Sequence, residues 1–431
     1  MKTRTRFALG VCVLAAGAAA VIWSLNLRDE AEVNTPVAYA TSDSQIERGA
    51  YLTRAGNCMA CHTARGGPSY AGGQGIPTPF GTVFTSNLTP DANTGIGSWS
   101  AAHFWRALHN GRSKSGRLLY PAFPYTSYTQ VTREDSDAMF AYLRSLPAVD
   151  QPNRPHLLDF PFQSQAALAV WRALYFRPGV YQPDARQNAE WNRGAYLVKG
   201  LGHCGDCHSP RDALGGTRHS LALAGGLIPM QNWYAPSLIS PHEAGVGAGD
   251  SDPTVNLLKH GVAPGASASG PMAEVVLRST QYLSQPDLDA MAHYLKALAD
   301  SNPKPAAPQA GPAHAASSAA TTAKLYEQHC AQCHGDKGQG QGIANAYPPL
   351  AGNRAVTMAS TENLVQMVLN GGFPPATAGN PRPFGMPPFV LVLNDSEVAG
   401  VITHIRTSWG NQASEITPMD VNRIRAHQAA E

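Results

Sequence analysis

One five-residue pattern, C-x-x-C-H, occurs three times in this sequence and constrains its fold more than any other feature. The copies are Cys58-Met59-Ala60-Cys61-His62, Cys204-Gly205-Asp206-Cys207-His208 and Cys330-Ala331-Gln332-Cys333-His334. Two thiols at this spacing can bond to the two vinyl groups of a haem, and the following His can ligate the iron. The pattern predicts three covalently bound haems c. The attachment residues are Cys58, Cys61, Cys204, Cys207, Cys330 and Cys333, and the proximal iron ligands are His62, His208 and His334.

A zinc site is the alternative interpretation of paired cysteines. A four-cysteine site would have to join two of these pentads across domains. The three pentads use six of the seven cysteines, and each already ends in the His that a haem requires. The repetition therefore favours haem over zinc.

Composition indicates compact, loop-rich units built around something other than protein. Charged residues make up 14% of the chain, against roughly 25% in an average domain, and there are 41 Gly and 34 Pro. A haem supplies the apolar body that a few short helices can cover. The formal net charge of +2, without a basic stripe, argues against a nucleic-acid partner.

Each pentad lies within the same order of expected elements. Arg48-Gly49-Ala50-Tyr51-Leu52 precedes the first pentad, and the identical Arg193-Gly194-Ala195-Tyr196-Leu197 precedes the second. A loop follows each pentad and contains a residue pair that ends in leucine, called the leucine pair below. The three leucine pairs are Asn87-Leu88, Ser237-Leu238 and Pro349-Leu350. We then expect short helices that end at Gly over 104–111, 255–261 and 364–371, and closing helices over 133–146, 285–298 and 394–408.

This order predicts an all-α fold of three tandem class I cytochrome c-like domains with loop-rich connections, preceded by a membrane segment. The expected divisions are a signal sequence or anchor over 1–40, domains over 41–150, 187–300 and 323–414, a connector with a helix over 151–186, a Pro/Ala-rich linker over 301–322 and a tail over 415–431. The linker composition suggests that the third domain moves relative to the first two.

The N-terminus predicts export. Three basic residues precede an apolar run over residues 7–27, which is long enough to span a bilayer. We favour an uncleaved anchor that leaves the haem domains on the periplasmic side of the bacterial inner membrane. Removal of a signal sequence near Ala38-Tyr39-Ala40 is the alternative.

The sixth iron ligands differ between the copies. Met opposite the proximal His is usual in electron-transfer haems, and Met386 and Met272 occupy matching Gly/Pro-rich places in copies three and two. In copy one that place holds Phe123, which cannot ligate iron. Met139 is a weak candidate there, and the other candidates are His103, His109 and His156.

Four longer stretches resemble the triheme cytochrome c subunits of membrane-bound bacterial dehydrogenases, of the alcohol and gluconate dehydrogenase type. They are Gly202-His203-Cys204-Gly205-Asp206-Cys207-His208 with Pro210-Arg211, Asn232-Trp233-Tyr234-Ala235-Pro236-Ser237-Leu238, Pro348-Pro349-Leu350-Ala351-Gly352-Asn353 and Ile405-Arg406-Thr407-Ser408-Trp409-Gly410-Asn411. The resemblance implies an electron-transfer subunit without its own substrate chemistry. Such a subunit takes electrons from a catalytic subunit and passes them to membrane quinone or a terminal oxidase.

Phe123 departs from the alcohol dehydrogenase pattern, which has Met at that place. Together with the connector over 171–179, it looks more like cytochrome subunits that accompany molybdenum hydroxylases of the nicotinate or isoquinoline dehydrogenase kind. The catalytic partner therefore stays open among PQQ, FAD and molybdenum enzymes. A different class of function is a haem peroxidase that uses an open iron at the first haem.

Overall fold

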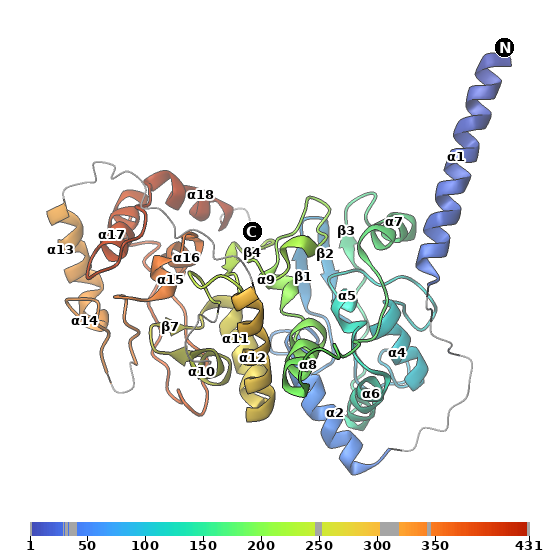
Figure 1. Cartoon of the computed structure of the whole chain (residues 1–431), viewed down its shortest axis with the longest axis horizontal. Helices are drawn as coiled ribbons and strands as arrows, with labels where there is room; N and C mark the ends of the chain where they lie inside the picture. Colours follow the sequence, from blue (N-terminus) through green and yellow to red (C-terminus); the bar gives the residue numbers. More distant parts are fainter. Residues whose placement is uncertain are drawn as a thin grey trace. The chain divides into compact units, whose positions relative to one another are not determined.

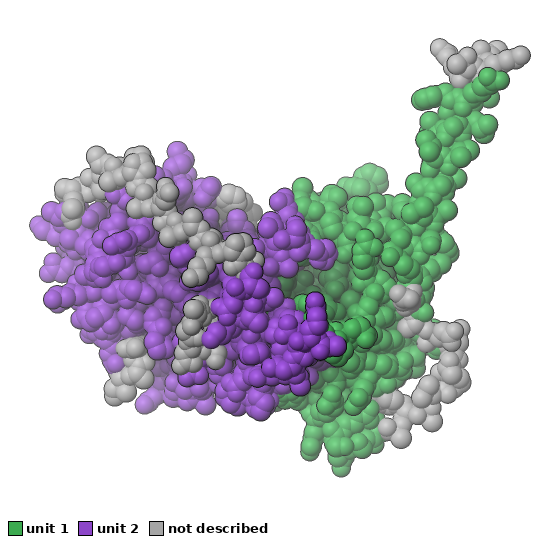
Figure 2. All heavy atoms as spheres, in the orientation of Figure 1, with its two compact units in different colours: residues 1–184, 198–206, 212–217 green, residues 185–197, 207–211, 218–431 purple. Residues whose placement is uncertain are grey.

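A computed structural model describes residues 2–28, 30, 33, 41–245, 252–301, 319–342 and 346–428. The chain divides into two compact units (Figure 2), which are described separately. Unit 1 comprises residues 1–184, 198–206 and 212–217, and unit 2 comprises residues 185–197, 207–211 and 218–431. The chain passes between the units around the second pentad, so that Cys204 belongs to unit 1 whereas Cys207 and His208 belong to unit 2.

Unit 1 contains the first pentad, the connector and the N-terminal helix (Figure 1). Its elements are α1 (Lys2–Asn26), α2 (Asp43–Ala55), α3 (Cys58–Cys61), β1 (Gly75–Thr78), β2 (Gly81–Phe84), α4 (Ala101–Asn110), α5 (Tyr125–Tyr128), α6 (Arg133–Ser145), β3 (Leu157–Leu158) and α7 (Gln165–Tyr175). The three strands form one antiparallel sheet in the order β1-β2-β3, with Ile76 opposite Val83 and Thr82 opposite Leu157.

Unit 2 contains most of the second copy and all of the third. Its helices are α8 (Ala189–Tyr196), η2 (His219–Leu221), α10 (Asp252–His260), α11 (Gly270–Arg278), η3 (Thr280–Tyr282), α12 (Gln285–Ser301), α13 (Ala319–His329), α14 (Ala331–His334), α15 (Arg354–Thr357), α16 (Glu362–Asn370), α17 (Asp395–Thr407) and α18 (Pro418–Gln428). Two small antiparallel sheets pair β4 (Gly226–Ile228) with β5 (Trp233–Ala235) and β6 (Val262–Ala263) with β7 (Ala266–Ser267). A π-helix, η1 (Leu197–Leu201), and α9 (Gly205–His208) carry the chain between the units.

Local sequence signals begin and end these helices. The Gly after each of the three short helices has a left-handed φ, of 56° at Gly111, 75° at Gly261 and 64° at Gly371, where a side chain would add strain. Ser, Thr or Asn side chains accept a backbone N–H at the N-termini of several helices, and so remove unpaired donors. Six of these caps are Ser42, Ser100, Thr132, Ser164, Asn188 and Asn394.

The first two copies each contain a close helix crossing of the same kind. A Cβ placed on Gly49 of α2 would overlap the carbonyl oxygen of Ala138 in α6, so the two backbones touch. Arg48, the residue before Gly49, donates through Nε to Asp135 Oδ1 at 3.0 Å. The Arg-Gly pair therefore joins the helix before the first pentad to the closing helix of its copy.

Unit 2 repeats this crossing between α8 and α12. A Cβ on Gly194 would overlap the carbonyl oxygen of Ala290, and Arg193 binds both carboxylate oxygens of Asp287 at 2.7 Å. The duplicated segments over 193–197 and 287–291 thus fold into the same arrangement as their first-copy counterparts.

The third copy closes differently. Helices α16, α17 and α18 bury one apolar cluster, whose members include Val365, Leu369, Val398 and Ile402. Arg406 of α17 is fully buried, and its guanidinium donates to the carbonyl oxygens of Val356, Met358 and Ser414 at 2.6 to 2.9 Å. Burial lowers the pKa of Arg406 to about 10, so the guanidinium is still charged at neutral pH. Its hydrogen bonds connect the segment around Val356 and Met358, before α16, to Ser414, after α17.

The second and third copies pack together within unit 2. The Arg354 guanidinium donates to the Gly245 carbonyl oxygen at 3.0 Å, and the Thr377 hydroxyl donates to that of His260 at 3.0 Å. In both bonds a side chain of the third copy donates to a main-chain carbonyl of the second. The movement of the third domain relative to the first two stays a prediction. The linker over 301–322 lies outside the described residues except at its ends.

The expected helices are present, with small shifts at their ends. The helices predicted over 104–111, 133–146, 285–298 and 394–408 correspond to α4, α6, α12 and α17. The predominance of helix is confirmed. The three small sheets were not expected, because each consists of short strands in loops whose sequences carry no alternating apolar pattern.

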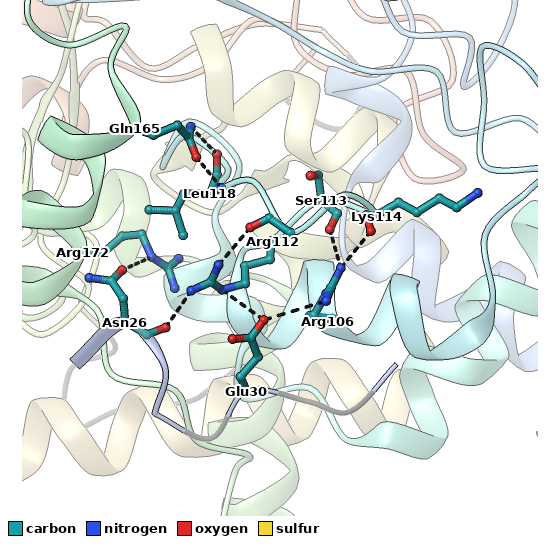
Figure 3. A network of polar contacts seen from close by, with 10 residues as sticks. Asn26, Glu30, Arg106, Arg112, Ser113, Lys114, Leu118, Gln165 and Arg172 are labelled. Atoms are coloured by element: carbon teal, nitrogen blue, oxygen red, sulfur yellow. Dashed lines mark hydrogen bonds and ion pairs between the residues drawn. The ribbon is translucent and has the colours of Figure 1, made fainter. Parts of the chain in front are cut away.

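The end of α1 is fixed to the body of unit 1 by polar contacts (Figure 3). Asn26 donates through Nδ2 to the Ala169 carbonyl oxygen of α7 at 2.9 Å, and its Oδ1 accepts from Arg172 Nε at 3.0 Å. Arg112 donates to the Asn26 carbonyl oxygen at 3.0 Å and also lies 3.4 Å from the Glu30 carboxylate. The last residue of α1 and Glu30 thus supply oxygen acceptors to Arg112 and Arg172, which are largely buried.

Candidate haem attachment sites

The first pentad forms one tight turn of helix. Asn57 has a left-handed φ of 51°, and α3 then carries Cys58 and Cys61 through a single turn that ends at His62. The His62 N–H donates to the Cys58 carbonyl oxygen at 3.0 Å, which closes the turn. The His62 Nδ1 lies 2.6 Å from the carbonyl oxygen of Ser86.

The second pentad follows the π-helix. His203, directly before Cys204, has a left-handed φ of 37°, and α9 brings the chain to His208. The His208 Nδ1 lies 2.6 Å from the carbonyl oxygen of Pro236. The His208 carbonyl accepts from the Gly225 N–H at 2.8 Å, so both ends of this residue are held by the following loop.

The third pentad repeats the turn in α14. The His334 N–H donates to the Cys330 carbonyl oxygen at 2.9 Å, and the His334 Nδ1 lies 2.9 Å from the carbonyl oxygen of Pro348. Tyr326 packs its ring against Trp409 and donates its hydroxyl to the Gly335 carbonyl oxygen at 2.6 Å. The turn is therefore held from both sides.

All three histidines present the same ring nitrogen to a backbone carbonyl. Because a carbonyl oxygen can only accept, each Nδ1 carries the proton, which leaves the Nε2 lone pair free for a metal. Burial lowers the pKa of each imidazole, an effect that the hydrogen bond to the carbonyl partly opposes. The neutral, oriented imidazole is the form that ligates iron.

The three acceptor carbonyls were missed by sequence reasoning. Ser86, Pro236 and Pro348 each stand one residue before a leucine pair that the repeat had singled out. Their matching positions were the available signal. Side-chain chemistry could not reveal them, because the functional atom belongs to the main chain.

The paired cysteines are free of disulfides in the described structure. Burial and the neighbouring thiol raise the pKa of Cys58 to about 12 and that of Cys330 to about 11, so these side chains are protonated thiols. Within the described ranges, no three His, Cys, Asp or Glu side chains converge as a metal-binding group.

The candidate sixth ligands of the second and third copies lie in different settings. Met386 lies in a loop and is half-buried. Its N–H donates to the Gly372 carbonyl oxygen at 2.8 Å, and its carbonyl oxygen accepts from the Gly372 N–H at 3.0 Å. Met272 was expected in a loop but lies in the first turn of α11, after Pro271. The difference arises because Pro suits the first turn of a helix as well as a loop.

Phe123 lies next to the first pentad. Its ring centroid is 5.5 Å from that of Tyr128, whose hydroxyl donates to the Gly56 carbonyl oxygen two residues before Cys58. Met139 is 1% exposed inside α6, a burial that suits a core side chain.

The three candidate histidines of the first copy are each engaged in local contacts. His103 caps α4 together with Ser100. His109 is buried, bonds to the Thr129 carbonyl oxygen at 2.9 Å and stacks on Trp105. His156 accepts from the Phe84 N–H at 3.1 Å.

The residues present fit haem c on the chemistry of the donor set. Each pentad offers two thiols on one turn and an imidazole whose tautomer is fixed by a carbonyl. A thiol that adds to a vinyl group must not be part of a disulfide, and an imidazole ligand must be neutral. All three pentads meet both requirements.

Comparison with known proteins agrees with this geometry. The cytochrome c family profile matches residues 46–147 and 319–409. The cytochrome c subunit of alcohol dehydrogenase (quinone) from Gluconacetobacter polyoxogenes is 38% identical over 398 residues, covering 88% of this chain and 84% of that one. The gluconate 2-dehydrogenase cytochrome c subunit of Pantoea cypripedii is 37% identical over 406 residues, covering 90% and 91%. A nicotinate dehydrogenase subunit from Pseudomonas putida is 38% identical over 410 residues, covering 91% of this chain but 33% of that one. The chain therefore belongs to the cytochrome c subunits of bacterial dehydrogenases.

Proposed function

We propose that the chain is a triheme cytochrome that carries electrons away from the catalytic subunit of a dehydrogenase. The observation that carries this proposal is one hydrogen bond that recurs in all three pentads. The Nδ1 of each pentad histidine bonds to the backbone carbonyl of the residue directly before a leucine pair. One haem c is assigned to each of three domains, over 41–150, 187–300 and 323–414. The relatives are electron-transfer subunits, and the redox chemistry belongs to the haem rather than to side chains.

The protein's own residues would hold and tune each haem. The cysteine pairs 58/61, 204/207 and 330/333 would attach the three haems. His62, His208 and His334 would ligate the irons, and Met272 and Met386 would complete the second and third sites. A bound haem supplies one reversible electron at its iron. The surrounding helices supply burial and spacing.

The catalytic partner would contain PQQ, FAD or molybdenum. PQQ and FAD are supported by the relatives, because these include cytochrome subunits of alcohol and gluconate dehydrogenases. Phe123 and the nicotinate dehydrogenase relative support the molybdenum type. Electrons would then pass to membrane quinone or a terminal oxidase.

We assign the chain to the periplasmic face of the inner membrane, anchored by residues 7–27. Within α1, residues Thr5–Asn26 form an exposed helix that is long and apolar enough to cross a membrane. The contacts of Asn26 and Glu30 support retention of this helix (Figure 3), since cleavage beyond them would leave Arg112 and Arg172 buried without those acceptors. The alternative cleavage sequence over 38–40 lies outside the described residues.

Haem counting and co-purification test the proposal together. Expressed with a haem c maturation system, the chain is expected to bind three haems, and Cys330→Ser with Cys333→Ser is expected to bind two. The large subunit that co-purifies from its native membrane should reduce all of them when its substrate is added. A chain that carries no covalent haem, or haems that the co-purified enzyme never reduces, would contradict the proposal.

A haem peroxidase is the second candidate, and Phe123 is the observation that favours it. If the first haem lacks a sixth protein ligand, peroxide could reach its iron. Peroxide-dependent turnover by the isolated chain that is abolished by His62→Gly but not by His334→Gly would support this function. A fully low-spin spectrum without turnover would end it.

A further inference from the structure

The face of α7 that points away from unit 1 is apolar, the reverse of an ordinary surface helix. Leu168 and Arg172 are buried on one side of α7, at 4% and 2% exposure. Residues two positions away lie on the opposite side, and there Val170 and Leu174 are 44% and 60% exposed, in line with exposed Ala166. The exposed stripe of α7, formed by Ala166, Val170 and Leu174, thus contains no polar side chain.

The chain just before α7 adds to this apolar surface. Leu157 of β3 is 64% exposed and Phe160 is 85% exposed. Two arginines near this region, Arg117 and Arg177, are also exposed. Large apolar side chains beside cations are typical of a protein surface that rests on lipid headgroups.

The position of α7 is tied to the end of α1. Asn26, the last residue of α1, donates to the Ala169 carbonyl oxygen in the middle of α7 at 2.9 Å. Arg172 of α7 donates to the Oδ1 of Asn26 at 3.0 Å, a bond that Figure 3 draws. Figure 1 shows α1 leading away from the side of unit 1 on which α7 and β3 lie. A membrane that contains α1 must therefore meet this side of unit 1.

The length of α1 sets the depth of α7. The apolar part of α1, Thr5–Asn26, has 22 residues. At 1.5 Å per residue this helix is about 33 Å long, close to the ~30 Å of a bilayer's hydrocarbon core. With α1 filling the core, Asn26 reaches the level of the headgroups, and so does the helix that it binds.

We propose that the exposed stripe of α7 lies in the interfacial region of the lipid bilayer, as a second membrane contact beside α1. The inference rests on the proposed retention of α1 as an anchor. Lipid is favoured over a protein partner because α7 is hydrogen-bonded to the end of α1, the helix that would span the bilayer. The contact would hold unit 1 against the membrane surface instead of letting it swing on a single helix.

Spin labels on the full-length, haem-loaded chain test this placement. All variants are made in a Cys12→Ser background. Val170→Cys and Leu174→Cys each carry the label on the stripe. Ser145→Cys, at an exposed position at the end of α6, is the matched control. The proteins are reconstituted into vesicles of phosphatidylcholine and phosphatidylglycerol. Collision of each label with oxygen, which concentrates in lipid, and with a water-soluble nickel chelate is then measured.

The expected result is strong collision with oxygen and weak collision with nickel at positions 170 and 174, and the reverse at 145. Equal exposure to nickel at all three positions, in protein that floats with the vesicles, would overturn the α7 inference alone. Protection that requires the catalytic subunit would overturn it in favour of a protein partner. Protein that does not float with vesicles would instead contradict the proposed anchor.

Discussion

Asn363 and the backbone of Tyr234 form two reciprocal hydrogen bonds. The Asn363 Oδ1 accepts from the Tyr234 N–H, and its Nδ2 donates to the Tyr234 carbonyl oxygen, both at 2.8 Å. Strand β5 already pairs with β4 on its other edge, so one carboxamide of α16 satisfies the edge that would otherwise stay open. Two residues further on, Pro236 accepts the hydrogen bond of His208, which links this contact to the second pentad.

Replacing Asn363 with Leu should loosen this edge. The change leaves a backbone N–H and a carbonyl of Tyr234 without partners, at a cost of about 1 to 3 kcal/mol in the free energy of unfolding. Because β5 leads directly to Pro236, we also expect a changed midpoint potential at the haem attached next to His208. Chemical unfolding and a redox titration of the holoprotein measure the two effects.

Thr377→Val is the matched control for that change. It removes the hydrogen bond from Thr377 to the His260 carbonyl, which also joins the second and third copies but does not touch β5. Its unfolding free energy should fall, whereas its potentials should stay at their wild-type values. The same shift of potential in both variants would show that β5 has no special effect on the haem.

Substitution of Met386 or Met272 by Ala should lower the potential of one haem each. Thioether sulfur stabilises reduced iron, and axial ligands move haem potentials over a range of ~0.8 V, so a fall of roughly 100 mV or more is expected. Met139→Leu, inside the core of α6, should leave all potentials unchanged. Three unshifted midpoints in the Met386→Ala protein would remove Met386 as a ligand.

Gly49→Ala should destabilise unit 1. The added Cβ meets the Ala138 carbonyl of α6, and the helices must separate at a cost of about 2 to 3 kcal/mol. Gly179→Ala is the control, because no atom lies within 4 Å of its added Cβ. Equal thermal midpoints for the two variants would show that the crossing tolerates separation.

Acid should weaken the contact between α17 and α18. Hydrogen bonds from Asn422 and Arg425 lower the pKa of Asp395 below its ordinary value of 3.8. The unfolded chain therefore binds the proton first, so this contribution to stability is present above pH 3.8 and is lost as pH falls through the lowered value. Asp395→Asn should be less stable than wild type at neutral pH and should lose less stability between pH 5 and pH 3, measured by denaturant unfolding.

The helices and the haem turns were accessible from the sequence because their signals are local. Capping residues, Gly at helix ends and the repeated Arg-Gly segments placed α6, α12 and α17 within a few residues of their observed bounds. The spacing within each pentad likewise predicts the haem attachment residues, which stay a prediction. The repeat also aligned segments, such as 135–139 and 287–291, that occupy the same place in two crossings.

Features that depend on paths of loops were not accessible. The carbonyls of Ser86, Pro236 and Pro348 act through main-chain atoms, which no residue type marks. The packing of the third copy on the second uses single polar side chains on loop backbones, which no local sequence pattern marks. Met272 was placed in a loop because Gly and Pro precede it, although both residues also begin a helix.

The two glycine crossings have a consequence for how this protein tolerates change. At Gly49 and Gly194, main chain meets main chain, so the separation of each helix pair is set by contact between backbone atoms and not by side-chain volume. Substitutions elsewhere along these helices can weaken the crossing but cannot narrow it. The distance between the start of the pentad turn and its closing helix therefore has the same lower limit in the first two copies, although their loops differ in sequence.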